Sequence, residues 1–387
     1  MNRQEQAFDA AVRVELKRLH TLIAPRFGRP EVRERVRRYL EGLLEPVDHR
    51  TGRQMAEQLG EGRADGVQRL LNAARWDADA VRNDLRDYVL EHFGHPAGVL
   101  VLTEAGFPKK GAKSVGVERL RNPTTGRIEN RQLGLFLTYA SPRGWAFMDR
   151  ALYLPERWAQ NEDQRRQAGV PEEVTFATKG ELARRMLERA FDASVPAAWI
   201  AGGETYGTDR KLRRWLEARG RFYVLAEAHA SKLPPGAGTL LPPVSEWIRF
   251  GSVGGAERAY EWARGVRRHE RDVGRAEWLL VCHAVEPTDA YIYHGTYGPR
   301  QTALSGMVRI VATRWAIEEG LKRARDEVGL DQYEVRRWDA WHRRITLSLL
   351  AHAALQVTRA RAKSGGYIQV PHSLQFDTSP DTNVGGT

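Results

Sequence analysis

A carboxylate side chain follows an apolar run near residue 100. The stretch VLVLTEAGFPKKG is predicted to be a buried β-strand that ends at Thr103 and Glu104, followed by a glycine turn at Gly106 and then a lysine cluster. In α/β proteins, sites lie where strands end and polar side chains begin. The pattern makes Glu104 a candidate for acid or base chemistry and leaves open whether it is a working carboxylate.

A second group of polar side chains lies on a predicted helix near residue 70. Two short helices, GRQMAEQLG and ADGVQRLLNAARW, are broken by GEGR, and we expect Asp65 to cap the second. This arrangement resembles a helix-turn-helix, which places its second helix in a DNA major groove. Gln68, Arg69, Asn72 and Arg75 would then donate hydrogen bonds to DNA, although ordinary helical bundles show the same pattern.

The elements that must position these residues follow from the apolar periodicity. Residues up to about Gly94 read as helices, and Asp77 is expected to cap the last of them, DADAVRNDLRDYVLEHF. Strands are then predicted at GVLVL, SVGVERL, IENRQLGLFLTYAS, WAFMDRALYL, AAWIAGGETYG and RFYVLAEA. Helices at KGELARRMLERAFDA and KLRRWLEARG alternate with the later strands, so we predict helices flanking an antiparallel or mixed sheet.

The predicted secondary structure changes twice in the last third of the chain. A Pro/Gly linker, SKLPPGAGTLLPP, precedes strands at EWLLVCHAV and AYIYHGTYG, and two long helices follow, RIVATRWAIEEGLKRARDEVG and DAWHRRITLSLLAHAALQVTRARA. We divide the chain into a helix-turn-helix-like region (1–94), the first part of the core (95–228), a β-rich insertion or sheet extension (229–300), C-terminal core helices (301–364) and a disordered tail (365–387).

The amino-acid composition limits the classes of protein to which the chain could belong. Lys and Arg number 60 against 49 Asp and Glu, a formal net charge of +11, which favours a polyanionic partner such as nucleic acid. The alternative is a general abundance of arginine from a GC-rich genome. The single cysteine, Cys282, excludes an internal disulfide framework and is expected to be a buried thiol. No apolar stretch approaches the roughly 20 residues of a membrane span, so we expect a soluble cytoplasmic protein.

Ordered blocks of sequence resemble one family of mobile-element proteins. The blocks include RLHTLIAPRF, VQRLLNAARWDADAVRNDLRDYV, KKGAKSVGV, GRIENRQLGLFLTYASPRG, LYLPERW, VPEEVTFATK, VPAAWIAGGETYG, GLDQYEVRRW and ITLSLLAHA. They resemble the transposases of the IS4 superfamily, in the IS701-like group. The resemblance implies an α/β (α+β) fold with an RNase H-like mixed sheet, an all-helical N-terminal domain and a β-rich insertion before the last catalytic helix. It also allows a homodimer.

The resemblance implies three carboxylates that hold two Mg²⁺ or Mn²⁺ ions for DNA strand transfer. The family's first aspartate, in a motif like V-D-E-T-G-F, is here Thr103, and its second, in T-G-D-E-x-Y-G, is here Gly203. The third carboxylate is retained as Glu318, in a signature that maps onto Arg314, Glu318 and Arg325. Spacings of four and seven residues place these three on one helix face, so Arg314 can pair with Glu318. We therefore expect no bound metal.

Glu104 and Glu204 each follow a lost aspartate. Adjacent residues on a strand point to opposite faces of the sheet, so neither glutamate can replace the missing ligand without a bulge. Relatives carry both glutamates beside the aspartates. We interpret Glu104 and Glu204 as inherited neighbours.

Two functions from different classes remain. The first is a nuclease-dead, domesticated transposase that binds DNA. Its phosphate contacts would come from Lys109, Lys110, Lys113, Arg314 and Arg325. The alternative for these residues is a solvated lysine turn and a structural ion pair.

The second function is a metal-independent enzyme that acts on a small-molecule ligand in the old cleft, with Glu318 as general acid or base. Gly320 would leave room for a ligand. Possible cleft partners are Thr103, Glu104, Glu204, Tyr206 and His283 or His294. For His283, inside the apolar run WLLVCHAV, a packed, hydrogen-bonded role is the expected one.

Overall fold

The computed structural model describes residues 3–45, 50–61, 63–122, 125–230, 237–251, 259–270, 274–285 and 290–364. They fall into two compact units. Unit 1 takes its residues from Met1–His95, Glu104–Val195 and Gly320–Gln369, and unit 2 takes its residues from Pro96–Thr103 and Pro196–Glu319. Strand β1 (Val99–Pro108) and helix α12 (Leu304–Val328) each contribute to both units. The predicted tail, 365–387, lies outside the described residues.

Ten strands are hydrogen-bonded in the order β2-β3-β1-β5-β6-β10-β9-β8-β7, with β4 beside β3. Pairing is parallel between β1, β5 and β6 and antiparallel from β6 through β10, β9, β8 and β7. The prediction of a mixed sheet flanked by helices is thereby confirmed. The remaining strands span Glu118–Arg121 (β2), Ile128–Ser141 (β3), Gly144–Leu152 (β4), Trp199–Gly202 (β5), Phe222–Ala230 (β6), Ile248–Phe250 (β7), Tyr260–Glu270 (β8), Arg275–Ala284 (β9) and Tyr291–Pro299 (β10).

The N-terminal part of unit 1 is helical, as predicted. Its helices are α1 (Arg3–Ile23), α2 (Pro30–Leu44), α3 (Gly52–Gln58), α4 (Asp65–Asn72) and α5 (Ala78–Phe93). Asp77 caps α5 by accepting a hydrogen bond from the Asp79 backbone N–H. The expected cap at Asp65 is wrong, because Asp65 is already the first helical residue and Ala64, which has no capping side chain, precedes it.

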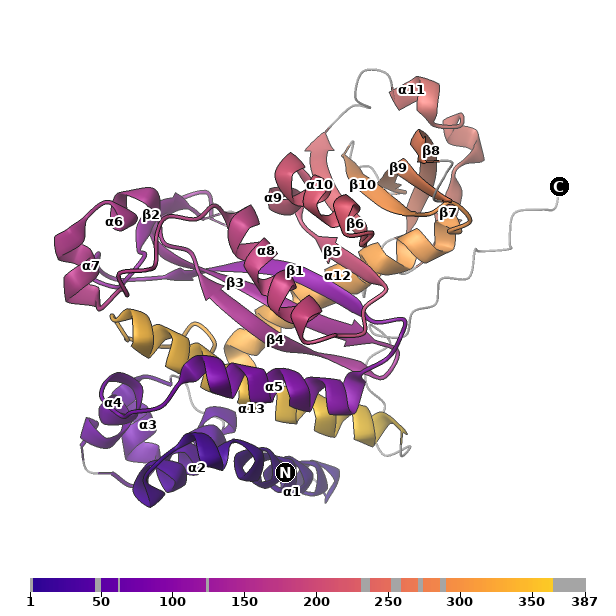
Figure 1. Ribbon diagram of the computed structural model, residues 1–387. Coiled ribbons are helices and arrows are strands. Elements are labelled where there is room, and N and C mark those ends of the chain that lie inside the picture. The colour runs from indigo at the N-terminus through magenta and orange to yellow at the C-terminus, as the bar shows by residue number, and fades with distance from the viewer. Residues whose placement is uncertain are drawn as a thin grey trace. The chain divides into compact units, whose positions relative to one another are not determined.

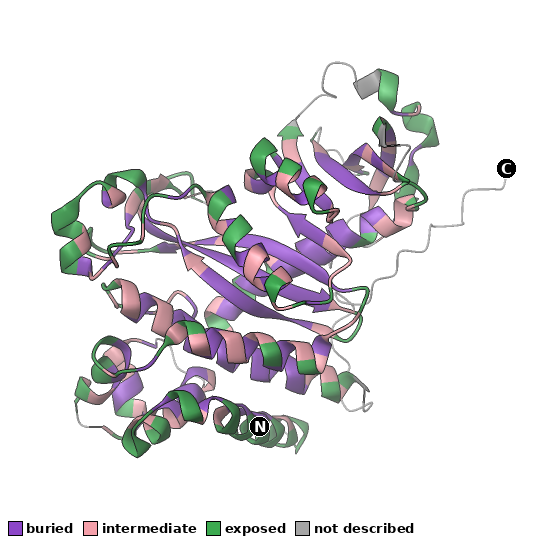
Figure 2. Ribbon diagram, in the orientation of Figure 1, coloured by how far each residue is buried: buried purple, intermediate pink, exposed green. Residues whose placement is uncertain are grey.

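Helix α13 (Trp338–Ser364) forms the centre of the helical part of unit 1. It packs against α1, α2, α4, α5 and β4. Contacts on so many sides explain why most of its residues are buried, whereas α1 exposes its outer face to solvent (Figure 2). Three further helices complete the unit: α6 (Glu156–Ala159), α7 (Glu162–Ala168) and α8 (Lys179–Asp192), the last packed on β3 and β4 (Figure 1).

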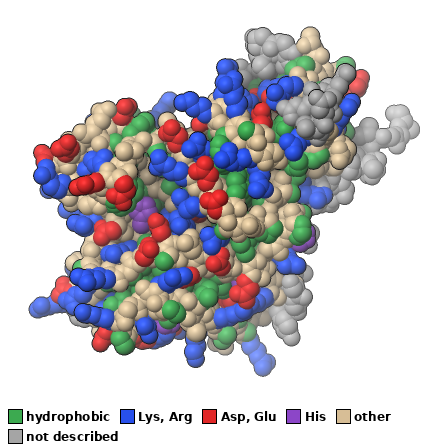
Figure 3. All heavy atoms as spheres, in the orientation of Figure 1, with side chains coloured by type: hydrophobic (Ala, Val, Ile, Leu, Met, Phe, Trp, Pro, Cys, Tyr) green, Lys and Arg blue, Asp and Glu red, His purple; other side chains and the backbone are tan. Residues whose placement is uncertain are grey.

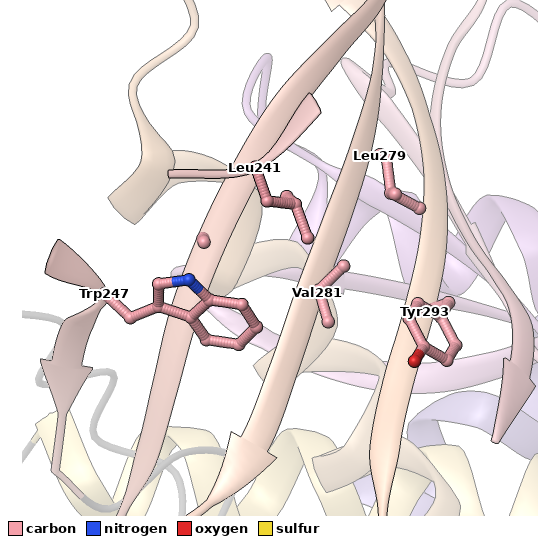
Figure 4. Close-up of a cluster of buried hydrophobic side chains, with 6 residues drawn as sticks. Leu241, Trp247, Leu279, Val281 and Tyr293 are labelled. Carbon is pink, nitrogen blue, oxygen red and sulfur yellow. The ribbon is translucent and has the colours of Figure 1, made fainter. Parts of the chain in front are cut away.

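In unit 2, the β-rich segment extends the sheet. Of the two predicted possibilities, an insertion or a sheet extension, the structure therefore has the second. On one face of β8, β9 and β10, apolar side chains form a core with Leu241 and Trp247; they are Ala263, Leu279, Val281 and Tyr293 (Figure 4). Alternation places Trp262 and His294 on the other face, where Trp315 of α12 contacts Trp262. Unit 2 also contains α9 (Glu204–Gly207), α10 (Arg210–Ala218) and α11 (Ala237–Leu240).

Among the helices in the described ranges, none has the length and apolar character needed to cross a bilayer.

Candidate functional site

Thr103 and Gly203 lie side by side in the register of two parallel strands. The last paired residues of β1 and β5 are Leu102 and Gly202, and the two positions follow directly. Thr103 is 4% exposed, and its buried Oγ1 has no hydrogen-bond partner in the described part of the chain. A Cβ added to Gly203 would meet no atom within 4 Å. This point of the sheet thus has room for a side chain at 203 and offers one neutral hydroxyl.

The strand predicted through GGETYG is wrong beyond Gly202. There β5 ends, Gly203 becomes the N-cap of α9, and Glu204 is the first residue of that helix. The chain turns tightly against β6, since a Cβ on Gly207 would lie 1.8 Å from the Ala226 carbonyl oxygen. The direction of Glu204 is therefore set by a helix start and not by strand alternation.

The Glu204 carboxylate faces solvent. Its side chain is 55% exposed, and Oε2 lies 3.8 Å from Nδ1 of His229, which is 56% exposed. An exposed pair of this kind contributes little to stability. His229 belongs to β6, and no sequence pattern had singled it out.

Strand β1 continues past Thr103 to Pro108, so the predicted strand end at Thr103 and glycine turn at Gly106 are wrong. Within this strand, Glu104 points away from the face of Thr103. Glu104 Oε2 forms an ion pair with Lys179 Nζ at 2.9 Å. Lys179 begins α8, which Thr178 and Glu181 mark as a helix start through a capping box. The sequence thus indicates the helix start, but not the contact with Glu104.

Tyr206 is a buried residue of α9 that reaches back to β1. Its ring is 1% exposed, and its hydroxyl donates a hydrogen bond of 3.5 Å to the backbone oxygen of Thr103. Tyr206 therefore links α9, which begins after Gly203, to the backbone of Thr103.

The predicted pair on α12 is present. A guanidinium nitrogen of Arg314 donates a hydrogen bond to Glu318 Oε1, with 7% of the Arg314 side chain and 39% of the Glu318 side chain exposed. The retained carboxylate is thus bound to a cation at an open position. Arg325 lies on the same helix, and its buried Nε has no hydrogen-bond partner among the described residues.

Both histidines proposed as cleft partners are packed. His294 is fully buried against Trp262, and burial, with help from nearby Arg314, lowers its pKa well below the usual range. His283 contacts Glu261 at 3.0 Å and the Ala284 carbonyl oxygen at 3.0 Å, which confirms its expected role. The prediction for His294 as a cleft residue is wrong, because no part of it reaches solvent.

Position 320 offers no room for a ligand. A Cβ on Gly320 would lie 2.4 Å from two atoms of the Trp145 ring. The glycine allows Trp145 to pack directly on the helix backbone. The expected free space is therefore filled by an aromatic side chain of the protein itself.

Cys282 is 0% exposed, and burial raises the pKa of its thiol. It is the inert, buried cysteine that its apolar surroundings predicted.

The three lysines after β1 differ in environment. Lys109 Nζ donates a hydrogen bond of 3.0 Å to the Tyr333 backbone oxygen and lies 3.3 Å from the centroid of the Tyr333 ring. Burial lowers the pKa of Lys109 to about 7. Lys110 and Lys113 are exposed. The expectation that Lys109 contacts phosphate does not fit an ammonium group held on Tyr333.

Helix α4 exposes the predicted donors Gln68, Arg69 and Asn72, and Arg75 follows the helix in an exposed position. Asn72 uses one amide hydrogen on the Gln68 backbone oxygen. The face is thus available to a partner.

The donor atoms at the predicted positions do not fit two divalent metals. Thr103 supplies a hydroxyl, Gly203 supplies no side chain, and Glu318 is bound to Arg314. Hard divalent cations in such sites need several carboxylate oxygens. Across the part of the chain that the structure describes, no cluster of three or more His, Cys, Asp and Glu side chains has a metal-binding arrangement.

Comparison with known protein families gives a match over residues 23–252. A family model described as DDE superfamily endonuclease matches this range, which includes Thr103 and Gly203 and ends before α12. The mixed sheet flanked by helices is consistent with an RNase H-like core. A search of curated proteins found no match.

Proposed function

Since this chain belongs to the DDE superfamily endonucleases, we propose that it is a transposase-like DNA-binding protein that does not perform two-metal strand transfer. Within the superfamily we assign it to the IS4 superfamily and its IS701-like group. One observation carries the proposal: Thr103 and Gly203, the residues that we align with the two aspartates of the family's motifs, directly follow the last paired residues of β1 and β5.

The chemistry of the remaining groups supports loss of the reaction. Two metals activate the attacking oxygen and stabilise the leaving oxygen, and acidic ligands must offset their combined positive charge. A threonine hydroxyl is neutral, and the single carboxylate of Glu318 is already compensated by Arg314. Glu104 is paired with Lys179 and points away from Thr103, so it does not restore the missing charge.

The distribution of charge supports DNA binding. The chain carries a net charge of +11, and the exposed cations Lys110, Lys113 and Arg69 stand on surfaces of unit 1. Contacts between such cations and phosphate release counterions, which makes binding strongly dependent on salt.

Duplex binding as a function of salt concentration tests the proposal. We expect log K to fall steeply with log salt, and Lys110→Gln with Lys113→Gln to reduce that slope by up to about 1.8, at about 0.9 for each lost phosphate contact. Lys109→Met is the matched control, because its ammonium group is held on Tyr333; the slope should not change. Failure of the wild-type chain to bind duplex DNA at any salt concentration would refute DNA binding.

A plasmid-nicking assay tests the loss of strand cleavage separately. With Mg²⁺ or Mn²⁺ present, we expect no nicking above the level of a protein-free sample. Metal-dependent nicking that Glu318→Gln abolishes would show that the site still works.

The alternative is a metal-independent enzyme acting on a small molecule. Its support is that the buried hydroxyls of Thr103 and Thr296 lack hydrogen-bond partners within the described residues of unit 2. However, Glu318 is 39% exposed and ion-paired, unlike the buried carboxyl group that this alternative requires. A metal-independent activity lost in Glu318→Gln would favour it over DNA binding.

A further inference from the structure

Helix α10 in unit 2 separates apolar and basic residues cleanly. Asp209 caps it by accepting hydrogen bonds from the backbone N–H groups of Lys211 and Leu212. Leu212 and Leu216 are buried on one side of the helix. At 100° per residue, the opposite side presents Arg210, Lys211 and Arg214, which we call the α10 basic face.

The cations of this face are not used within unit 2. Arg210, Lys211 and Arg214 are exposed and have no ion-pair partner among the described residues. The acidic side chains nearby are engaged elsewhere: Glu227 binds Arg213 and Arg267, and Glu217 binds Tyr223 and Arg268. The face is therefore a concentration of uncompensated positive charge.

Trp215 lies beside the α10 basic face, and Arg219 follows the helix as its C-cap. The Arg219 guanidinium lies 4.4 Å from the centroid of the Trp215 ring. Stacking on the ring orders the guanidinium and leaves its N–H edges free to bind anions.

We propose that the α10 basic face binds the phosphate backbone of duplex DNA. This inference rests on the proposed function and names the part of unit 2 that carries it out. Arg210 and Arg214 are one turn apart, about 6 Å along the helix axis, so they can bind neighbouring phosphates of one strand. Blue side chains stand over this region in Figure 3, and Figure 1 shows α10 beside α9, which begins after Gly203.

The α10 basic face is charged and lacks an apolar surface that could insert into a bilayer, so duplex DNA fits it better as a partner than an anionic membrane does. A helix that lies in a bilayer surface inserts a broad apolar face. In α10 the leucines are buried inside the unit, and the α10 basic face carries no large apolar side chain.

A salt titration of duplex binding with two matched triple variants tests the inference. The first variant combines Arg210→Gln, Lys211→Gln and Arg214→Gln. It should make the dependence of log K on log salt less steep, reducing the magnitude of the slope by up to about 2.7. The control, Lys17→Gln, Arg119→Gln and Arg185→Gln, removes the same charge from three exposed cations on α1, β2 and α8, and should leave the slope close to that of the wild type. Both variants change exposed side chains, so their thermal midpoints should match that of the wild type.

The outcomes separate this inference from the proposed function. If the wild type shows no salt-dependent duplex binding, the proposed function fails. If the wild type binds steeply and the α10 variant behaves like the control, only the role of the α10 basic face is refuted. If the α10 variant loses the ability to bind phosphatidylserine vesicles while its duplex binding is unchanged, the face binds membranes and the inference is overturned.

Discussion

Arg314 and Glu318 form a hydrogen-bonded ion pair one turn apart on α12, in which the arginine is buried and the glutamate is partly exposed. In the proposed alignment with the family's motifs, this glutamate is the one acidic residue among the three site positions. Its partner neutralises the charge that a metal would need. The retained carboxylate is thus part of the fold as it stands.

Removal of Glu318 should therefore reduce stability. Glu318→Ala leaves the buried Arg314 guanidinium without its carboxylate, and we expect a loss of about 1 kcal/mol in the free energy of unfolding, a value limited by the 39% exposure of Glu318. Urea unfolding measures it. The control is Glu57→Ala, which breaks the i,i+4 pair with Arg53, whose side chains are 84% and 59% exposed; there the change should stay below about 0.5 kcal/mol. Equal effects in the two variants would contradict the structural role.

A methyl group at position 320 should destabilise unit 1. Gly→Ala inside a helix normally adds stability, by about 1 kcal/mol. At Gly320 the new Cβ would lie 2.4 Å from the Trp145 ring, so overpacking should reverse the sign and cost roughly 1–3 kcal/mol. Gly306→Ala in the same helix is the control, because its nearest neighbour, Thr302 Cγ2, is 3.7 Å away. Thermal unfolding of both variants checks the prediction; stabilisation by Gly320→Ala would disprove the contact.

Lys109 should make stability depend on pH above neutrality. Burial lowers its pKa in the folded state to about 7 from the ordinary 10.5. Between these values the unfolded chain binds more protons than the folded one, so the free energy of unfolding rises with pH from about 7 to about 10.5. Lys109→Met removes this contribution, and its unfolding free energy should rise less between pH 7 and pH 9 than that of the wild type. Parallel pH profiles from urea unfolding would rule out the buried, neutral lysine.

Placing aspartates at positions 103 and 203 tests whether the proposed former metal site can still bind a divalent ion. Gly203→Asp should be tolerated, because open space surrounds that position and its φ of −75° suits any residue. Thr103→Asp buries a charge at a site 4% exposed, so alone it should destabilise the chain by about 1–3 kcal/mol. In the double variant, Mn²⁺ should recover part of that loss as a rise in thermal midpoint, because the ion binds the folded state only. No shift with Mn²⁺ would mean that the other ligands are misplaced.

Local sequence features predicted the elements of this protein well. The run IENRQLGLFLTYAS coincides with β3, Asp77 caps α5, and the spacing of Arg314 and Glu318 places an ion pair on α12. Each of these depends on a few neighbouring residues, through strand alternation, a capping side chain or one helical turn. The proposed replacement of both aspartates likewise rests on the sequence motifs alone.

Tertiary structure decided what surrounds these residues. Lys109 and Tyr333 are 224 positions apart in the sequence. Their contact holds Lys109 inside the protein, whereas the sequence had predicted that it contacts phosphate. The Trp145 ring fills the space beside Gly320, Lys179 forms an ion pair with Glu104, and Gly207 at the end of α9 packs closely against Ala226 of β6. Such contacts depend on which distant side chains the packing of strands and helices brings together. Composition and periodicity carry no information about that choice, so the surroundings of Lys109, Glu104 and Gly320 became known only from the folded chain.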